Sequence, residues 1–178
     1  MKIEIKNLKH SPSLSQETNA YTCDIIVEGL KAGYAENSGH GGSTTIHPYP
    51  NKNKLIQIAE EYLSKQPKVD LGNGIVIDMD LEFHIDNLVE KAILNKELVH
   101  QLTRVKRLTL KNIVVVDQKE YEAFSAGKAT SLGMQTHKFK IPISDIPVET
   151  LKQHVAKIKS SLKAGQIILN SGPAFKAV

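Results

Sequence analysis

The 178-residue chain is long enough to bury one full hydrophobic core, and its composition, 40% hydrophobic and 24% charged, excludes disorder over most of its length. The longest apolar runs, Ile113 to Val116 and Ile167 to Leu169, are far too short to span a bilayer, so we expect no membrane partner. The net charge of +4 hides an asymmetry, because residues 1–100 hold 10 Lys and 14 Asp or Glu, whereas residues 101–178 hold 13 Lys or Arg and 5 Asp or Glu.

The N-terminal part of the chain predicts an antiparallel sheet. Residues 2–9 alternate apolar and charged side chains, and residues 19–28 are rich in β-forming residues, as expected of strands with one buried face. A turn at Gly29 leads into a further strand over residues 31–36, so the last two strands form a hairpin. The residues expected on the buried face of the middle strand are Tyr21, Cys23, Ile25 and Val27.

Two helices are expected in the middle of the chain. Apolar residues at helical spacing predict a helix over residues 54–65, with Asn53 as its N-cap. From Ile75 the sequence fits both an alternating strand and a helical stripe, and the length of the pattern favours a helix over residues 80–105. Asp78 or Asp80 would cap this helix, and its negative charge would interact favourably with the positive N-terminal end of the helix dipole.

The C-terminal part predicts strands followed by a helix. Residues 110–117 have the pattern of a buried strand, and we expect residues 120–125 to pair back onto it. A further strand over residues 136–143 precedes a helix over residues 148–163, and residues 167–169 add a short strand.

These elements together predict an α+β fold. Antiparallel β-hairpins pack on a long central helix, and a C-terminal β-hairpin with a final helix completes the chain. We expect a single α+β domain over residues 1–178, with residues 1–75 and 76–178 as the alternative division into sub-units. The sequence leaves open whether the protein forms a homo-oligomer.

The run Asn-Ser-Gly-His-Gly-Gly-Ser-Thr-Thr at residues 37–45 is the most distinctive segment. Its glycines permit positive φ and a close approach of backbone to a ligand, and successive backbone N–H groups in such loops can converge on an anion. We therefore expect it to bind a phosphate-bearing small molecule or nucleotide. The expected ligand-binding residues are Asn37, Ser38, Gly39, His40, Gly41, Gly42, Ser43, Thr44, Thr45 and His47.

The glycine run has an alternative, purely structural interpretation. It lacks the Gly-Lys-Ser/Thr ending of a Walker loop and the spacing of a Rossmann fingerprint, and no βαβ unit surrounds it. The run would then be a turn that needs positive φ at Gly39, Gly41 and Gly42.

Neither a catalytic nor a metal site stands out. His40 beside Ser38 or Ser43 would be a candidate only if the protein were a hydrolase, since no Gly-x-Ser-x-Gly elbow is present. A zinc site using His40 and His47 would need partners from the central helix, for which His84, Glu82 and Asp86 are the candidates, but HExxH is absent. We expect no cofactor and no metal. The carboxylates at Asp78, Asp80, Glu82 and Asp86 have the pattern of a helix start with a solvated face.

The single cysteine and the N-terminus indicate the compartment. Cys23 excludes an internal disulfide, and its place on the apolar face of a strand predicts a buried, inert thiol. The N-terminus lacks the apolar core of a secretory signal. We therefore expect a cytoplasmic protein.

The basic half could support a phosphate-bearing ligand, with Arg104 and Arg107 as the expected basic residues. They are the only two arginines, and this scarcity argues against sequence-specific DNA recognition. Non-specific contact with phosphates stays open, as does a lysine-rich solvated surface. The lysines that populate the last predicted helix are Lys152, Lys157, Lys159 and Lys163.

Four segments of the first half of the chain form a recognisable pattern: Ser15-Gln16-Glu17-Thr18, Cys23-Asp24-Ile25-Ile26-Val27-Glu28-Gly29, Glu36-Asn37-Ser38-Gly39-His40-Gly41-Gly42 and Asp80-Leu81-Glu82. On these segments the chain resembles a family of small, uncharacterised phage and prophage proteins. In that family a similar Glu-Thr strand and hairpin lead to Ser-Asn-Asp-Gly-x-Gly-Gly, where this chain has Glu36 for Ser and Ser38 for Asp.

The resemblance implies a phage or mobile-element accessory protein with no established activity. By analogy with phage accessory proteins that bind host signalling nucleotides or block defence proteins, we expect a non-enzymatic, nucleotide-binding or counter-defence role. The alternatives are a protein-interaction module that acts on a host protein through its hairpin edge, or a hydrolase that uses His40.

Overall fold

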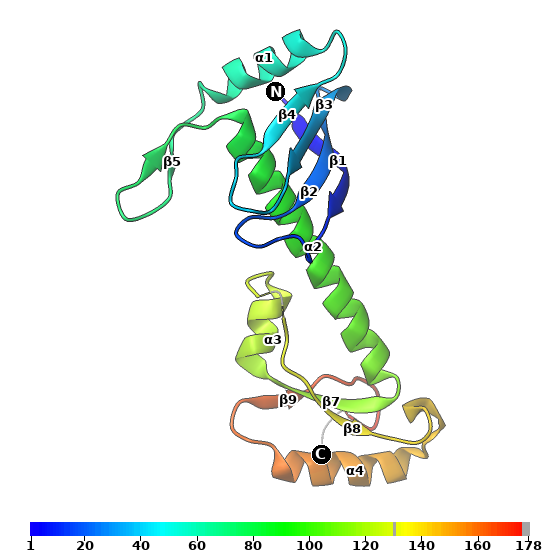
Figure 1. Cartoon of the computed structure of the whole chain (residues 1–178). Helices are drawn as coiled ribbons and strands as arrows, with labels where there is room; N and C mark the ends of the chain where they lie inside the picture. The colour runs from blue at the N-terminus through cyan, green and yellow to red at the C-terminus, as the bar shows by residue number, and fades with distance from the viewer. Residues whose placement is uncertain (130, 176–178) are drawn as a thin grey trace. The chain divides into compact units, whose positions relative to one another are not determined.

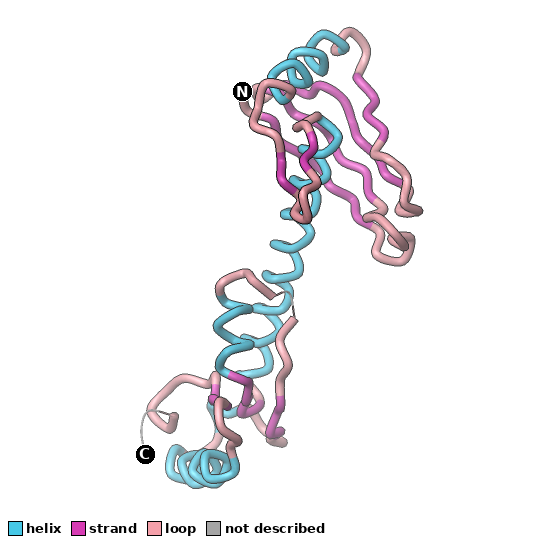
Figure 2. Tube along the Cα trace, turned by 90° about the vertical axis from the view of Figure 1, so that its left-hand side faces the viewer, coloured by secondary structure: helices cyan, strands magenta, loops and turns pink. Residues whose placement is uncertain are grey.

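The computed structural model describes residues 1–129 and 131–175 (Figure 1). It confirms an α+β fold with antiparallel sheets, a long central helix and a C-terminal helix. The contacts divide the chain into two compact units, unit 1 over Met1–Ile93 and unit 2 over Leu94–Val178. The helix α2 (Leu81–Thr109) begins in unit 1 and ends in unit 2, as one unbroken helix in Figure 2. The expected single domain, with its alternative division after residue 75, stays a prediction.

Unit 1 is built on a four-stranded antiparallel sheet with the order β1-β2-β3-β4. Its strands are β1 (Ile3–His10), β2 (Tyr21–Val27), β3 (Leu30–Asn37) and β4 (Thr45–Pro48). The first three confirm the predicted strands. The fourth has no alternating pattern of its own, and it forms because its residues pair with β3, from Glu36 opposite Thr45 to Gly33 opposite Pro48.

Two helices bury one face of this sheet. Helix α1 (Asn53–Leu63) and the first turns of α2 pack on the side chains that alternate along β2, as the sequence predicts. Asp80 caps α2 by accepting a hydrogen bond from the Phe83 backbone N at 2.7 Å, which confirms its expected role. The expected cap of α1 is wrong, because Lys52 occupies the N-cap position without a side-chain bond and Asn53 is already helical.

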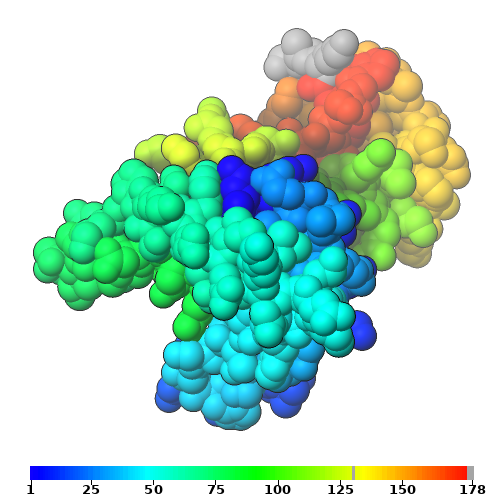
Figure 3. Space-filling view, turned by 90° about the horizontal axis from the view of Figure 1, so that it is seen from above, coloured from blue at the N-terminus to red at the C-terminus, as the bar shows by residue number. Residues whose placement is uncertain are grey.

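A small hairpin joins the two helices. Strands β5 (Val69–Asp70) and β6 (Val76–Ile77) form it, and it projects from the rest of unit 1 (Figure 3). The alternating pattern that begins at Ile75 therefore forms only two residues of strand. The helical stripe forms α2 instead, as expected from the length of the pattern.

Unit 2 has a three-stranded antiparallel sheet with the order β8-β7-β9. Its strands are β7 (Asn112–Asp117), β8 (Gln135–Lys138) and β9 (Gln166–Ile168). Side chains of β7 are buried on both faces. Ile113 and Val115 pack with helix α4 (Val148–Ser161), whereas Val114 and Val116 pack with helix α3 (Gln118–Ser125) and the end of α2.

The structure corrects two predictions in unit 2. Residues 120–125 form part of α3 and not a strand, because Asp117 accepts hydrogen bonds from the backbone N of Lys119 and Glu120 and so starts a helix. The strand predicted over residues 136–143 ends at Lys138, and a 3₁₀ turn η1 (Ile143–Asp145) follows Pro142. Within the described ranges, no helix is long and apolar enough to cross a bilayer.

Candidate functional site

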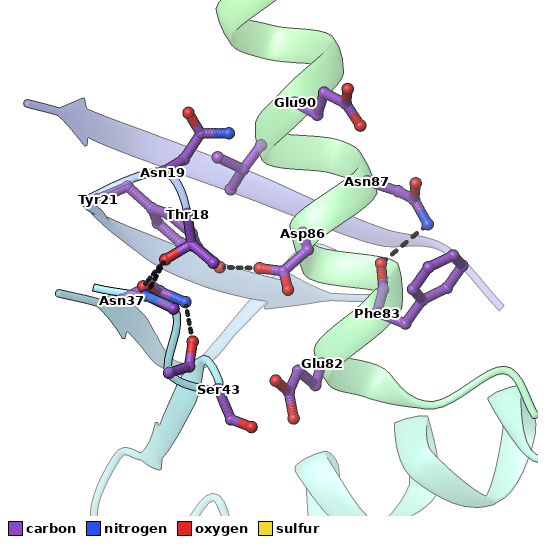
Figure 4. A pocket seen from close by; sticks show the side chains of 13 residues that line it. Thr18, Asn19, Tyr21, Asn37, Ser43, Glu82, Phe83, Asp86, Asn87 and Glu90 are labelled. Atoms are coloured by element: carbon purple, nitrogen blue, oxygen red, sulfur yellow. Dashed lines mark hydrogen bonds between the residues drawn. The ribbon is translucent and has the colours of Figure 1, made fainter. Parts of the chain in front are cut away.

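A pocket of about 510 Å³ lies between the glycine run and the first turns of α2 (Figure 4). We call it the loop pocket. One wall comes from the loop and the strand ends beside it, and the other comes from one face of α2. The residues of the two walls on which the argument depends are Thr18, Tyr21, Asn37, Gly41, Gly42, Ser43, Glu82, Asp86 and Glu90.

Asp86 ties the two walls together. Its Oδ1 accepts hydrogen bonds from the Tyr21 hydroxyl at 2.6 Å and from Thr44 Oγ1 at 2.7 Å. Both hydroxyl-bearing residues are about 5% exposed, so these bonds lie in a largely dry environment where they are strong. Burial raises the pKa of Tyr21 far above its ordinary value, and the hydrogen bond to Asp86 raises it further. The phenol therefore stays protonated and donates its hydrogen bond.

Asn37 holds the loop in shape through its side-chain amide. Its Nδ2 donates to the Gly42 carbonyl at 2.9 Å and to Thr44 Oγ1 at 3.1 Å, and its Oδ1 accepts from Thr18 Oγ1 and the Gly39 N, each at 2.9 Å. Because one buried side chain makes all four bonds, the loop is organised without a ligand.

The glycines of the run have different roles. Gly39 and Gly41 adopt φ of 86° and 83°, and a Cβ at Gly39 would collide with the Leu14 carbonyl and the Ala20 side chain. Gly42 has neither a positive φ nor a close neighbour, so the expected positive φ is wrong at this position. The structural interpretation of the run therefore accounts for two glycines and leaves Gly42 without a conformational reason.

Three backbone amides of the run are already bonded within the protein. The Gly39 N donates to Asn37, the Gly41 N donates to Thr18 Oγ1 at 3.3 Å, and the Thr44 N donates to Glu82 Oε1 at 2.9 Å. These are donors that a phosphate would need, so the anion-binding hypothesis loses much of its physical support at this loop.

The electrostatics of the loop pocket also disfavour an anion. Glu82, Asp86 and Glu90 are spaced four residues apart and line one wall from successive turns of α2, while the described lining contains no Lys or Arg. Asp86 Oδ2 accepts no hydrogen bond from the described residues, so acceptor capacity is left for a ligand. Within the described ranges, no cluster of three or more His, Cys, Asp or Glu side chains has the geometry to hold a metal ion.

The predicted site residues are only partly brought together. Gly41, Gly42 and Ser43 line the loop pocket with Asn37, while Thr44 is buried behind it. Ser38 borders a different depression, and Gly39 is buried. The predicted residues that do not line the loop pocket include the exposed His40 and Thr45, and Arg104 and Arg107, which belong to unit 2.

His47 does not line the loop pocket and contacts other side chains. It stacks on Tyr34 with ring centroids 4.5 Å apart, and its Nε2 lies 3.0 Å from Glu36 Oε1. Cys23 is buried as predicted, and burial raises the pKa of its thiol to about 11, which makes it a poor nucleophile.

The sequence interpretation missed the two residues that organise the site. The sequence assigns Tyr21 to the core, and it offers Asp86 either as a partner for a zinc site or as part of a solvated helix face. The solvated face is wrong for Asp86, because its carboxylate accepts hydrogen bonds from Tyr21 and Thr44. The four-residue spacing of Glu82, Asp86 and Glu90 was the available signal, since it puts the three carboxylates on one helix face.

Comparisons with known proteins give no further support for a particular activity. No protein-family model matches the chain, and no curated protein and no solved structure is significantly similar to it. The resemblance to phage and prophage proteins therefore stays a prediction, and any function has to be argued from the geometry of the site.

Proposed function

We propose that this chain is a non-enzymatic binding protein whose loop pocket takes a small organic molecule with a positively charged nitrogen group. The observation that carries the proposal is the wall of three carboxylates on α2, with Asp86 held in place by Tyr21 and Thr44. An ammonium or guanidinium group would gain charge-assisted hydrogen bonds from this wall. The volume of about 510 Å³ suits a small molecule.

The same geometry supports binding over catalysis. The thiol of Cys23 is buried and has a raised pKa, and His40 lies outside the pocket lining. The described lining contains no His, Cys or Lys that would act as a nucleophile or as a base near neutral pH. A wall without His, Cys or Lys, whose central carboxylate is already hydrogen-bonded to Tyr21 and Thr44, favours recognition of an intact ligand.

A phosphate-bearing ligand at the glycine run is the alternative, in line with an accessory role in a phage or mobile element. The exposed Gly42 and Ser43 at the mouth of the pocket favour it, because Gly42 has no conformational reason to be glycine. The three carboxylates oppose it, since each would repel a phosphate across the pocket. The charge of the ligand therefore separates the two proposals.

Thermal-shift measurements with spermidine and with ATP test this directly. We expect spermidine to raise the melting temperature of the wild-type chain and ATP to leave it unchanged. Glu90→Gln removes one carboxylate from the wall without breaking any hydrogen bond between described residues, and it should weaken the spermidine response several-fold.

Glu61→Gln is the matched control, because Glu61 is also an exposed helical glutamate but does not line the loop pocket. It should leave the spermidine response as in the wild type. An equal loss in both variants would show that spermidine binds the acidic surface at large. Protection by ATP that Gly42→Val abolishes would favour the phosphate alternative at the glycine run.

A further inference from the structure

Unit 2 contains a cavity of about 480 Å³ whose polar lining is basic, and we call it the lysine groove. It lies between the end of β8 and helix α4, and it belongs entirely to unit 2, apart from the loop pocket. The side chains that matter most are Lys138, Phe139 and Lys140 on the β8 side and His154, Lys157 and Ser161 on α4.

The fold explains why these side chains meet. β8 is an edge strand, so no further strand among the described residues covers its outer side. Helix α4 turns Leu151, Val155 and Ile158 into the core, which leaves the neighbouring positions His154 and Lys157 to form a wall of the groove.

The positive charge of the groove is not neutralised within the protein. No carboxylate belongs to its described lining, and Lys138, Lys140 and Lys157 form no ion pair with any described Asp or Glu. The glutamate of the first turn of α4, Glu149, is paired with Lys152 at 2.8 Å. Residues 94–178 carry 14 Lys or Arg against 6 Asp or Glu, so the surrounding field adds to the local charge.

An aromatic pair stands beside the lysines. The rings of Phe139 and His154 meet edge to face, with centroids 5.4 Å apart and an interplanar angle of 81°. Phe139 is only partly buried where it packs on the core of unit 2, so part of its surface stays open to the groove. Open aromatic surface between lysines is the combination with which proteins stack bases while they hold the phosphates of a single strand.

From this arrangement we infer that the lysine groove binds single-stranded nucleic acid through its phosphates, without preference for base sequence. The lysines act as point charges and supply no bidentate base contact, which is the reason for the absence of sequence preference. They come from both walls, so they match a chain of phosphates better than one terminal phosphate group, and binding releases several counterions. A free nucleotide also offers phosphates and a base, so it is the alternative ligand for the groove.

The test is fluorescence anisotropy of the full chain with a labelled oligothymidylate of about twelve nucleotides. Three lysine contacts give a salt slope of about −2, so the affinity should fall about 20-fold between about 50 mM and about 200 mM salt. Replacing Lys138, Lys140 and Lys157 together by Gln should weaken binding at least about tenfold at low salt and flatten that slope.

The matched control replaces Lys106, Lys119 and Lys128 by Gln. It removes the same charge from unit 2, but none of these lysines lines the groove, and Lys119 belongs to α3 on the opposite face of the sheet. Circular dichroism checks that both triple variants are folded before their affinities are compared. An equal loss of affinity in the control would overturn the inference, and so would the absence of binding by the wild type at low salt.

Two further probes separate the sources of phosphate. ATP should compete only weakly with the oligonucleotide, and competition at equal phosphate concentration would show a nucleotide site in place of a nucleic-acid site. Phe139→Leu keeps an apolar side chain on the core, and it should weaken binding of oligothymidylate but not of an abasic oligomer of the same length. Equal loss with both oligomers would overturn the stacking role of Phe139.

Discussion

The cavities of units 1 and 2 differ in charge more than in size. Residues 1–93 carry 9 Lys against 13 Asp or Glu, and the loop pocket presents three carboxylates. Residues 94–178 carry the opposite excess, and the lysine groove presents three lysines. The difference teaches that a modest net charge of +4 conceals two cavities whose linings carry opposite charge on one chain.

The largest expected effect tests whether the two units unfold separately. Phe124 is fully buried in unit 2, and Phe124→Ala should lower the free energy of unfolding of that unit by about 3–5 kcal/mol, because it leaves a cavity. Urea unfolding followed by circular dichroism measures the loss. The labelling rate of Cys23, which is buried in unit 1, should stay unchanged.

Ile85→Ala is the counterpart in unit 1, since Ile85 is fully buried beside the sheet that contains Cys23. Ile85→Ala should lower the free energy of unfolding of unit 1 by about 2–5 kcal/mol, and it should therefore accelerate labelling of the Cys23 thiol. If Phe124→Ala accelerated labelling of Cys23 as well, the two units would unfold together, and the expectation that each has its own stability would be wrong.

A second prediction separates structural glycines from the exposed one in the loop. Gly39→Ala should destabilise the protein by about 1–3 kcal/mol, because Gly39 has φ of 86° and no room for a Cβ. Gly42→Ala should change the free energy of unfolding by less than about 0.5 kcal/mol, because open space surrounds it. Thermal melts of the two variants measure the difference, and equal losses would contradict the distinction.

Tyr21→Phe should lower the free energy of unfolding by about 1 kcal/mol, because it removes the hydroxyl that donates a buried hydrogen bond to Asp86. Tyr121→Phe in unit 2 is the control, since Tyr121 packs by its ring against the core and no hydrogen bond of its hydroxyl is present among the described residues. Chemical unfolding compares the two. A cost for Tyr121→Phe equal to that of Tyr21→Phe would show that the Asp86 bond adds no stability.

The smallest expected effect is a pH dependence confined to unit 1. Hydrogen bonds from Lys31, Tyr49 and Asn7 lower the pKa of Asp24 to about 2, below its ordinary value near 3.8. A carboxyl whose folded pKa is lowered contributes stability above its unfolded pKa and loses it as the pH falls through the folded one. Melting temperatures should therefore fall between about pH 4 and about pH 2.

Asp24→Asn should flatten this part of the pH profile while leaving the other carboxylates in place. Comparing the profiles of the variant and the wild type isolates the contribution of Asp24. A variant profile as steep as that of the wild type would show that other groups govern the acid transition.

Local patterns were sufficient for most elements of the fold. Alternation predicted β1, the abundance of β-forming residues predicted β2, and the turn at Gly29 predicted β3. The length of the helical stripe selected α2 over a strand. The failures include residues 120–125, where the Asp117 cap outweighed strand propensity, and β4, which has no pattern of its own. They also include the strand predicted over residues 136–143, which ends at Lys138, and the expected cap of α1. Pairing with β3 creates β4, and no local rule contains that information.

For the candidate site, the sequence by itself determined the glycine run, the buried thiol of Cys23 and the excess of lysine in the C-terminal part. Only the tertiary structure decided what surrounds them. It placed Asp86, 65 residues from Tyr21, against the loop, and it set the lysines of β8 and α4 on two sides of one groove. The physical reason is that hydrogen bonds and electrostatic fields depend on distance in space, which the order of residues along the chain does not specify.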